Sequence, residues 1–153
     1  MSTTVETILL YTIAAGFLSI VYGFFTGKNI LNQNAGNAKM QDIASAIQIG
    51  AKAYLARQYK TIAVVGFVVL VIVGVAFSPL VGLGYLIGAA LSGIAGYVGM
   101  LVSVEANVRA AEASRKGLPN GLSVAFKSGA VTGMLVAGLA LLAIAVYYYL
   151  LLK

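Results

Sequence analysis

Four long runs of apolar residues dominate this chain, and its few charged residues lie between the runs or near their ends. The runs cover about residues 5–26, 57–77, 81–104 and 124–150. A helix rises 1.5 Å per residue, so about 20 residues cross the roughly 30 Å hydrocarbon core of a bilayer. Inside that core every backbone N–H and C=O group needs a hydrogen-bond partner within the protein, and an α-helix supplies these partners within one segment. The sequence therefore predicts an all-α integral membrane bundle of four transmembrane helices.

The composition excludes several classes of protein. Hydrophobic residues make up 61% of the 153 positions and charged residues only 9%, whereas soluble domains carry roughly 25% charged residues. The chain is therefore predicted to be a single membrane domain over residues 1–153. Cysteine and histidine are absent, which excludes disulfides, thiolate nucleophiles, Cys/His zinc sites and histidine acid–base catalysis.

The segments between the runs contain both turn and helix patterns. Residues 27–36 have the composition of a loop, and Asn37 is a suitable N-cap for the next helix. Apolar residues recur at steps of three and four over residues 38–56, which predicts an amphipathic helix that continues into the second run. Ser78 and Pro79 should end that helix. The connection 105–121 begins as a polar, alanine-rich extension of the third helix and breaks near Gly117.

Small residues recur every four positions in the third run, at Gly84, Gly88, Ser92 and Gly96. Such a pattern lets helix backbones approach closely in lipid, where packing drives association. We therefore expect the third helix to be tightly packed. The fourth run carries a second small pair, Gly129 and Gly133.

The placement of positive charge predicts the orientation. Nine of the ten basic residues fall in or beside the first and third connections: Lys28, Lys39, Lys52, Arg57, Lys60, Arg109, Arg115, Lys116 and Lys127. Because lysine and arginine accumulate in cytoplasmic loops, both long connections are predicted to be cytoplasmic and both termini outside. The basic residues alternate with apolar ones that membrane or helix neighbours would contact, so a nucleic-acid partner is not expected.

The ionisable residues give no candidate catalytic, cofactor-binding or metal-binding site. None of the four acids, Glu6, Asp42, Glu105 and Glu112, lies at the middle of a span, where a buried charge is normally kept for function. Glu105 with Arg109, and Glu112 with Lys116, have the i,i+4 spacing of exposed helix pairs. The acids are too scattered to hold magnesium.

Three ordered stretches carry a family resemblance. They are Gly36–Lys60, then Gly93–Met100 leading to Ala106–Arg109, and finally Leu122–Gly133. In sequence and spacing they resemble the second, third and fourth helices of the membrane-bound, ion-translocating inorganic pyrophosphatases. The resemblance extends over roughly Gly36 to Gly138.

This resemblance implies the N-terminal, outer-ring part of a homodimeric pump in a prokaryotic plasma membrane. Such a pump hydrolyses magnesium pyrophosphate and moves protons or sodium ions. The family's substrate motifs lie on later helices, so the resemblance implies that Mg²⁺ is bound elsewhere and that this chain alone is inactive. A truncated pump is the favoured interpretation. The alternatives are a free-standing bundle that binds a partner through Lys39–Lys60, and a small transporter that uses Glu6.

Overall fold

The computed structural model describes residues 3–152, with the side chains of residues 4–152. The described chain consists of four helices: α1 (Thr3–Leu31), α2 (Ala38–Ala76), α3 (Pro79–Ser114) and α4 (Leu118–Leu151). Each helix is long and apolar enough to cross a membrane. The described part of the chain contains no strand, which confirms the predicted all-α class of an integral membrane bundle.

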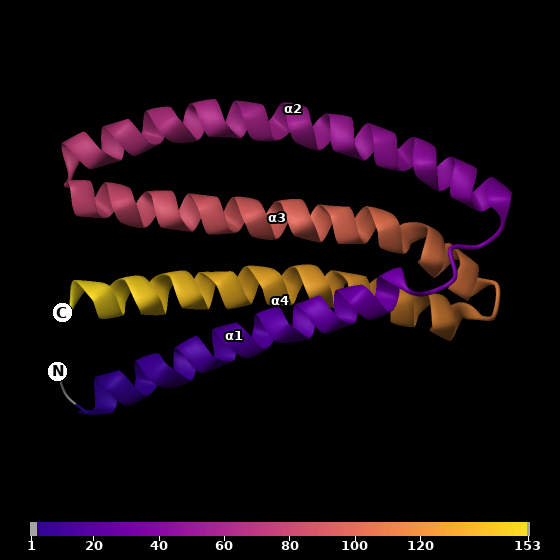
Figure 1. The fold of residues 1–153 in the computed structure, drawn as a ribbon, viewed down its shortest axis with the longest axis horizontal. Coiled ribbons are helices and arrows are strands. Elements are labelled where there is room, and N and C mark those ends of the chain that lie inside the picture. Colours follow the sequence, from indigo (N-terminus) through magenta and orange to yellow (C-terminus); the bar gives the residue numbers. More distant parts are fainter. Residues whose placement is uncertain (1–2, 153) are drawn as a thin grey trace.

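The helices form an open row in the order α2, α3, α4, α1 (Figure 1). The most extensive contacts join α3 to α4 and α1 to α4, whereas α2 contacts only α3 among the described helices. The start of α1 and the end of α4 lie at one end of the row, together with the turn between α2 and α3, and the other two connections lie at the opposite end. We call the latter the basic end, because the connections predicted to be rich in lysine and arginine meet there.

Side chains cap the N-terminal ends of α2 and α3, of which the Asn37 cap was predicted and the Ser78 cap was not. Asn37 caps α2 by accepting a hydrogen bond from the Met40 backbone N–H on its Oδ1 at 3.0 Å. Ser78 caps α3 in the same way, accepting from the Val81 N–H at 3.2 Å. Pro79 occupies the first turn of α3, where the absence of an N–H costs nothing. The third helix therefore begins two residues before the predicted span at residue 81.

The predicted loop over residues 27–36 is too long, because α1 continues to Leu31. Gly27 and Ile30 are buried, and Ile30 has no exposed surface. A Cβ at Gly27 would lie 3.7 Å from the Val131 side chain, so this last turn of α1 packs on α4. Tertiary packing thus overrides the local turn preference of the segment. The non-helical connection covers only residues 32–37.

The other long connection is also mostly helical. The predicted polar extension of the third helix is confirmed and reaches Ser114, and α4 already begins at Leu118. Only residues 115–117 lie outside the helices. Gly117 ends the turn with φ = +126°, a conformation that favours glycine.

The predicted small-residue stripe of α3 divides between two neighbours. A Cβ at Gly84 would lie 3.0 Å from the Tyr147 ring on α4, and one at Gly96 would lie 3.0 Å from the Tyr59 hydroxyl on α2. A Cβ at Gly88 would meet nothing within 4 Å. The expectation of tight packing is therefore confirmed at two positions of the stripe and wrong at Gly88, where α3 faces a cavity.

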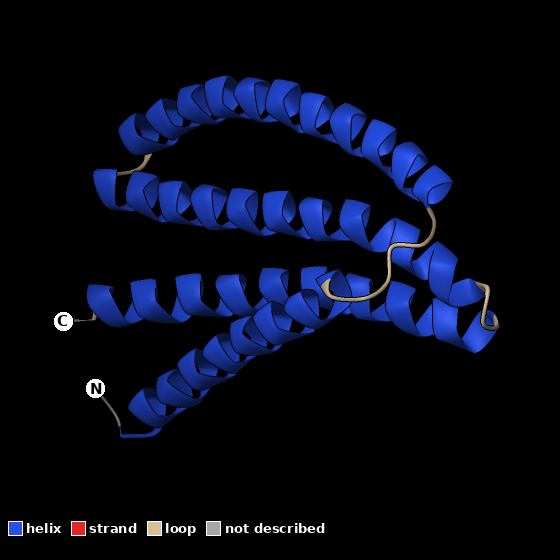
Figure 2. Cartoon of the chain, turned by 45° about the vertical axis from the view of Figure 1, so that its right-hand side comes forward, coloured by secondary structure: helices blue, strands red, loops and turns tan. Residues whose placement is uncertain are grey.

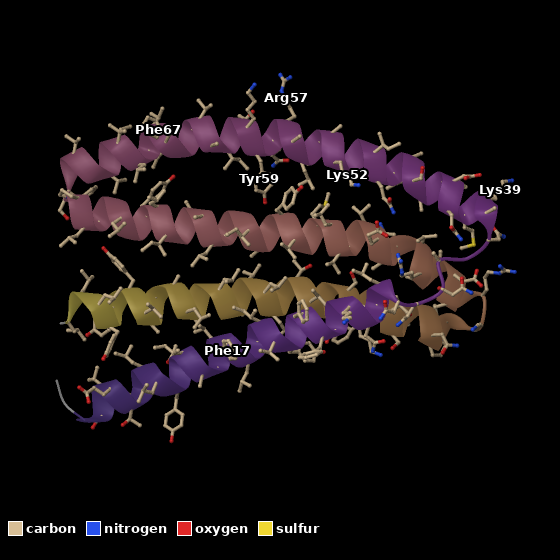
Figure 3. The ribbon with its side chains drawn as sticks, in the orientation of Figure 1. Phe17, Lys39, Lys52, Arg57, Tyr59 and Phe67 are labelled. Carbon is tan, nitrogen blue, oxygen red and sulfur yellow. The ribbon has the colours of Figure 1, made fainter. Side chains whose placement is uncertain are left out.

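Tyr59 joins the bowed helix α2 to the middle of α3 (Figure 3). Its hydroxyl donates to the Gly93 carbonyl at 2.7 Å, and its ring packs edge-on against Tyr97. Arg57, two residues earlier, points away from α3 (Figure 3) and is exposed. Tyr59 therefore faces the bundle while its basic neighbour faces the surroundings.

Tyr59→Phe should weaken the contact between α2 and α3. Interhelical hydrogen bonds in membranes contribute about 0.6–1.7 kcal/mol, and we expect a loss within that range. The loss would be measured as the free energy of unfolding in SDS titrations of the chain in lipid micelles. Tyr54→Phe is the matched control, because the Tyr54 side chain is 58% exposed; an equal loss in both variants would contradict a specific role for the Tyr59 hydroxyl.

Candidate functional site

Polar groups from α1 and α3 meet around Arg109 at the basic end. The Arg109 guanidinium donates from Nη2 and Nε to the Leu31 carbonyl oxygen, at 2.9 and 3.2 Å. Its Nη1 donates to a Glu105 carboxylate oxygen at 3.0 Å and to the Glu105 backbone carbonyl at 2.6 Å. One side chain of α3 thus satisfies a carbonyl at the C-terminal end of α1, where helix carbonyls lack internal partners.

The pair of Glu105 and Arg109, which was predicted to be exposed, is therefore partly buried. The two residues do pair at i,i+4, but only 13% of the Arg109 side chain is exposed. It lies beside an apolar cluster that joins α1, α3 and α4 and consists of Ile30, Ala106, Val124 and Val131. The alanines around Arg109 allow α1 to approach α3, and this is the sequence signal that indicates a packed position.

Glu112 pairs with Arg115 rather than with the predicted Lys116. The Arg115 Nη1 lies 3.1 Å from the Glu112 Oε2. Helix α3 ends at Ser114, so Lys116 has left the helical path on which the i,i+4 spacing was counted. The same carboxylate approaches the first connection, because a Cβ at Gly36 would lie 3.2 Å from Oε2.

A polar cavity of about 350 Å³ separates these groups at the basic end. Side chains from the first connection, α3 and α4 line it, among them Gln33, Arg109, Glu112, Lys116 and Asn120. The lining contains two basic groups and one carboxylate, and Arg115 already neutralises that carboxylate. The cavity is suited to solvated polar contacts and lacks the paired carboxylates of a magnesium-dependent hydrolytic site.

The acidic residues do not fit the Mg²⁺ that the resemblance implies for the whole pump. Within residues 3–152, no three histidine, cysteine, aspartate or glutamate side chains come together. Glu105 and Glu112 are each bound by an arginine, and Glu6 lies exposed in the first turn of α1, at the other end of the bundle. We therefore derive no catalytic step through a metal ion from this chain's residues.

The amphipathic start of α2 contributes a second, apolar cavity of about 250 Å³. It lies between α2 and the extension of α3 and is lined by Met40, Ile43, Ala44 and Ile47 from α2. Ala44 is buried, whereas Ile43 and Ile47 remain 56% and 51% exposed. The apolar face that the periodicity predicts therefore packs only partly on α3.

Comparison with known proteins gives a consistent result. Residues 17–153 match the family model described as inorganic H⁺ pyrophosphatase. A K⁺-insensitive pyrophosphate-energized proton pump of Methanosarcina mazei is 46% identical over 138 residues, which cover 89% of this chain and 21% of the relative. A pump of the same description from Caldanaerobacter subterraneus is 39% identical, with 86% and 22% covered. Another from Moorella thermoacetica is 38% identical, with 89% and 20% covered.

These relatives are much longer than the matched segment. The chain spans about a fifth of the length of each of them, so the comparison concerns one part of each pump. The match nevertheless includes most of this chain and all of α2, α3 and α4 as the structure describes them. The chain therefore belongs to the inorganic H⁺ pyrophosphatase family.

Proposed function

We propose that this chain serves as the N-terminal helical scaffold of a pyrophosphate-energised pump for protons or sodium ions. The observation that carries the proposal is an unpartnered face of α4 with a notch of two glycines. A Cβ at Gly129 or at Gly133 would meet nothing within 4 Å. Close approach of another helix at such a notch is the usual way in which membrane helices associate.

Large apolar side chains border this notch along the same face of α4. Phe126 is 79% exposed, Val136 51% and Ile144 70%. With Gly129 and Gly133 these residues follow steps of three, four and eight along the helix, so they share one face. The face is long enough to receive a further transmembrane helix, and the pumps that match this chain have about four-fifths of their length outside the matched segment.

The same proposal predicts no pyrophosphate hydrolysis by the chain alone. Transfer of a phosphoryl group from pyrophosphate requires metal ions and cationic groups around the phosphates. Arg109 and Arg115 neutralise the two glutamates at the basic end, and no three acidic, histidine or cysteine side chains come together within residues 3–152, so we assign the metal-binding part of the chemistry to other helices. We propose that Mg²⁺ binds on those helices.

The surroundings of the bundle follow from the same reasoning. Four candidate spans and membrane-pump relatives make this an integral membrane protein. We propose a prokaryotic plasma membrane, with the basic end in the cytoplasm and both termini outside, because lysine and arginine accumulate on the cytoplasmic side. A homodimer of complete pumps is part of the proposal.

A split-pump assay tests the scaffold function. The 153-residue chain would be co-expressed with the Methanosarcina mazei pump from which the matched N-terminal segment has been removed. We expect magnesium-dependent pyrophosphate hydrolysis and ion uptake in membrane vesicles only when both parts are present. Hydrolysis by the 153-residue chain alone would overturn the proposal that the catalytic groups lie on other helices.

Gly133→Leu tests the docking face in the same assay. A leucine in the notch should keep a neighbouring helix away and reduce the reconstituted hydrolysis at least tenfold, while the isolated chain stays folded. Gly50→Leu on α2 is the control, since a Cβ there also meets nothing within 4 Å. Full activity with Gly133→Leu would exclude this face as the docking surface.

A further inference from the structure

A wedge-shaped cavity opens between α1 and α3 on one side of the row. The two helices contact each other near the basic end and diverge toward the other end, where α4 runs between them in the view of Figure 2. The cavity between them measures about 480 Å³. Its walls and floor are apolar or glycine, with Gly23, Phe24 and Gly27 on α1, Val98 and Val102 on α3, and Leu135 on α4.

The mouth of the wedge is polar and positively charged. Lys28 and Asn32 line the cavity at its basic end, and no acidic residue lines it. The Lys28 side chain is exposed and forms no ion pair with any residue that the structure describes. The nearby Glu105 carboxylate is bound to Arg109. Lys28 therefore remains available to an external anion.

The predicted first span indicates the depth of the wedge in a bilayer. That span covers residues 5–26, which rise about 33 Å along a helix and so cross a hydrocarbon core of about 30 Å. Lys28 lies two residues beyond the span, so we expect its ammonium group in the headgroup region and the apolar walls in the hydrocarbon.

The length and lining of the wedge suit an acyl chain with an anionic headgroup. From Ile20 to Leu31 the cavity follows α1 over 12 residues, or about 18 Å, and Asn32 lines its end. A single acyl chain is flexible and thin enough to lie along such an apolar groove. Basic pockets between transmembrane helices are known sites for anionic lipid headgroups.

We propose that the wedge binds one anionic phospholipid. An acyl chain lies between α1 and α3 on the floor formed by Val131 and Leu135, and the phosphate contacts the Lys28 ammonium and the Asn32 amide. This inference rests on the wedge alone and does not depend on the proposed scaffold function.

Fluorescence quenching tests the proposal, because the chain has no tryptophan. Phe24→Trp places a reporter on the rim of the wedge. Phe25→Trp is the matched control, because Phe25 lies at the same depth and does not line the wedge, and the two side chains are 66% and 65% exposed. Each variant of the full 153-residue chain would be reconstituted in vesicles containing phosphatidylglycerol or phosphatidylcholine with brominated acyl chains.

We expect phosphatidylglycerol to quench the Phe24→Trp reporter at about fivefold lower mole fraction than phosphatidylcholine, which corresponds to one lysine–headgroup contact of about 1 kcal/mol. The Phe25→Trp reporter should show no such preference. Adding Lys28→Gln should abolish the preference at position 24, whereas Lys52→Gln, on a side chain outside the wedge, should leave it unchanged.

Three results would overturn the proposal. Equal preferences at positions 24 and 25 would mean that anionic lipid is only enriched around the whole protein. A preference that survives Lys28→Gln would remove the proposed headgroup contact. A reporter at position 24 that neither lipid quenches, beside a quenched reporter at position 25, would mean that protein covers the wedge.

Discussion

Arg109→Ala should lower the free energy of unfolding of the isolated chain by about 2–3 kcal/mol. The substitution removes both hydrogen bonds to the Leu31 carbonyl and the ion pair with Glu105. The carbonyl then lies at a helix end without its partner, and the Glu105 carboxylate loses its counter-charge. We expect the last turn of α1 to unwind and separate from α3.

The separation can be measured because the chain has no native cysteine. Cysteines introduced at Gln33 and Lys116, which line the same polar cavity, would carry a donor and an acceptor dye for energy transfer during SDS titration. Arg115→Ala is the control, because the Arg115 side chain is 61% exposed and an exposed ion pair contributes at most about 1 kcal/mol. Equal losses in the two variants would show that Arg109 acts only as a surface charge.

The sequence is sufficient to predict the features that depend on local chemistry. Long apolar runs specify membrane helices because the bilayer permits little else. Asn37 and Ser78 cap their helices as their side-chain oxygens allow, and Pro79 begins a helix for the same local reason. The helical extension of α3 past residue 104 likewise follows from an uninterrupted, alanine-rich segment.

Features that depend on contact between distant helices are not predictable in this way. The extension of α1 to Leu31 requires Val131, 100 positions away, and Arg109. Predicting that Glu112 pairs with Arg115 requires knowledge of where α3 ends. The spacing of residues along an assumed helix can be counted from a single sequence, but the sequence does not show which residue of another helix lies opposite.

The absence of catalytic and metal-binding residues from this chain stays a prediction, and the charged groups at the basic end have a structural role of their own. Arg109 pairs with Glu105 and joins α3 to the end of α1, whereas Arg115 pairs with Glu112 locally, so the contacts of Arg109 stabilise the bundle. We infer that selection acts on packing in this segment, and the positions with the least tolerance should be those where backbones touch.

Gly138→Leu should therefore destabilise the bundle strongly, by about 2–3 kcal/mol. Helices α1 and α4 approach closely at Gly138 and Gly16: a Cβ at Gly138 would lie 2.8 Å from the Gly16 carbonyl oxygen, and a Cβ at Gly16 would lie 2.9 Å from the Gly138 oxygen. Both obstacles are backbone atoms, so rotation of a side chain cannot relieve the clash and the helices must separate.

Sequence pattern alone pointed to Gly129 and Gly133 as the small pair of α4, and Gly133→Leu is the matched control for Gly138→Leu. A Cβ at Gly133 meets nothing within 4 Å, so the free energy of unfolding of the isolated Gly133→Leu chain should stay within about 0.5 kcal/mol of that of the unmodified protein. Dyes on cysteines at Tyr11 and Ile144, both largely exposed, would report the separation of α1 and α4 during SDS titration. If Gly133→Leu proved as destabilising as Gly138→Leu, the α1–α4 contact would not be the close approach that holds the bundle together. If only Gly138→Leu is destabilising, Gly16 and Gly138 pack this bundle internally, and Gly129 and Gly133 remain free for a neighbouring helix.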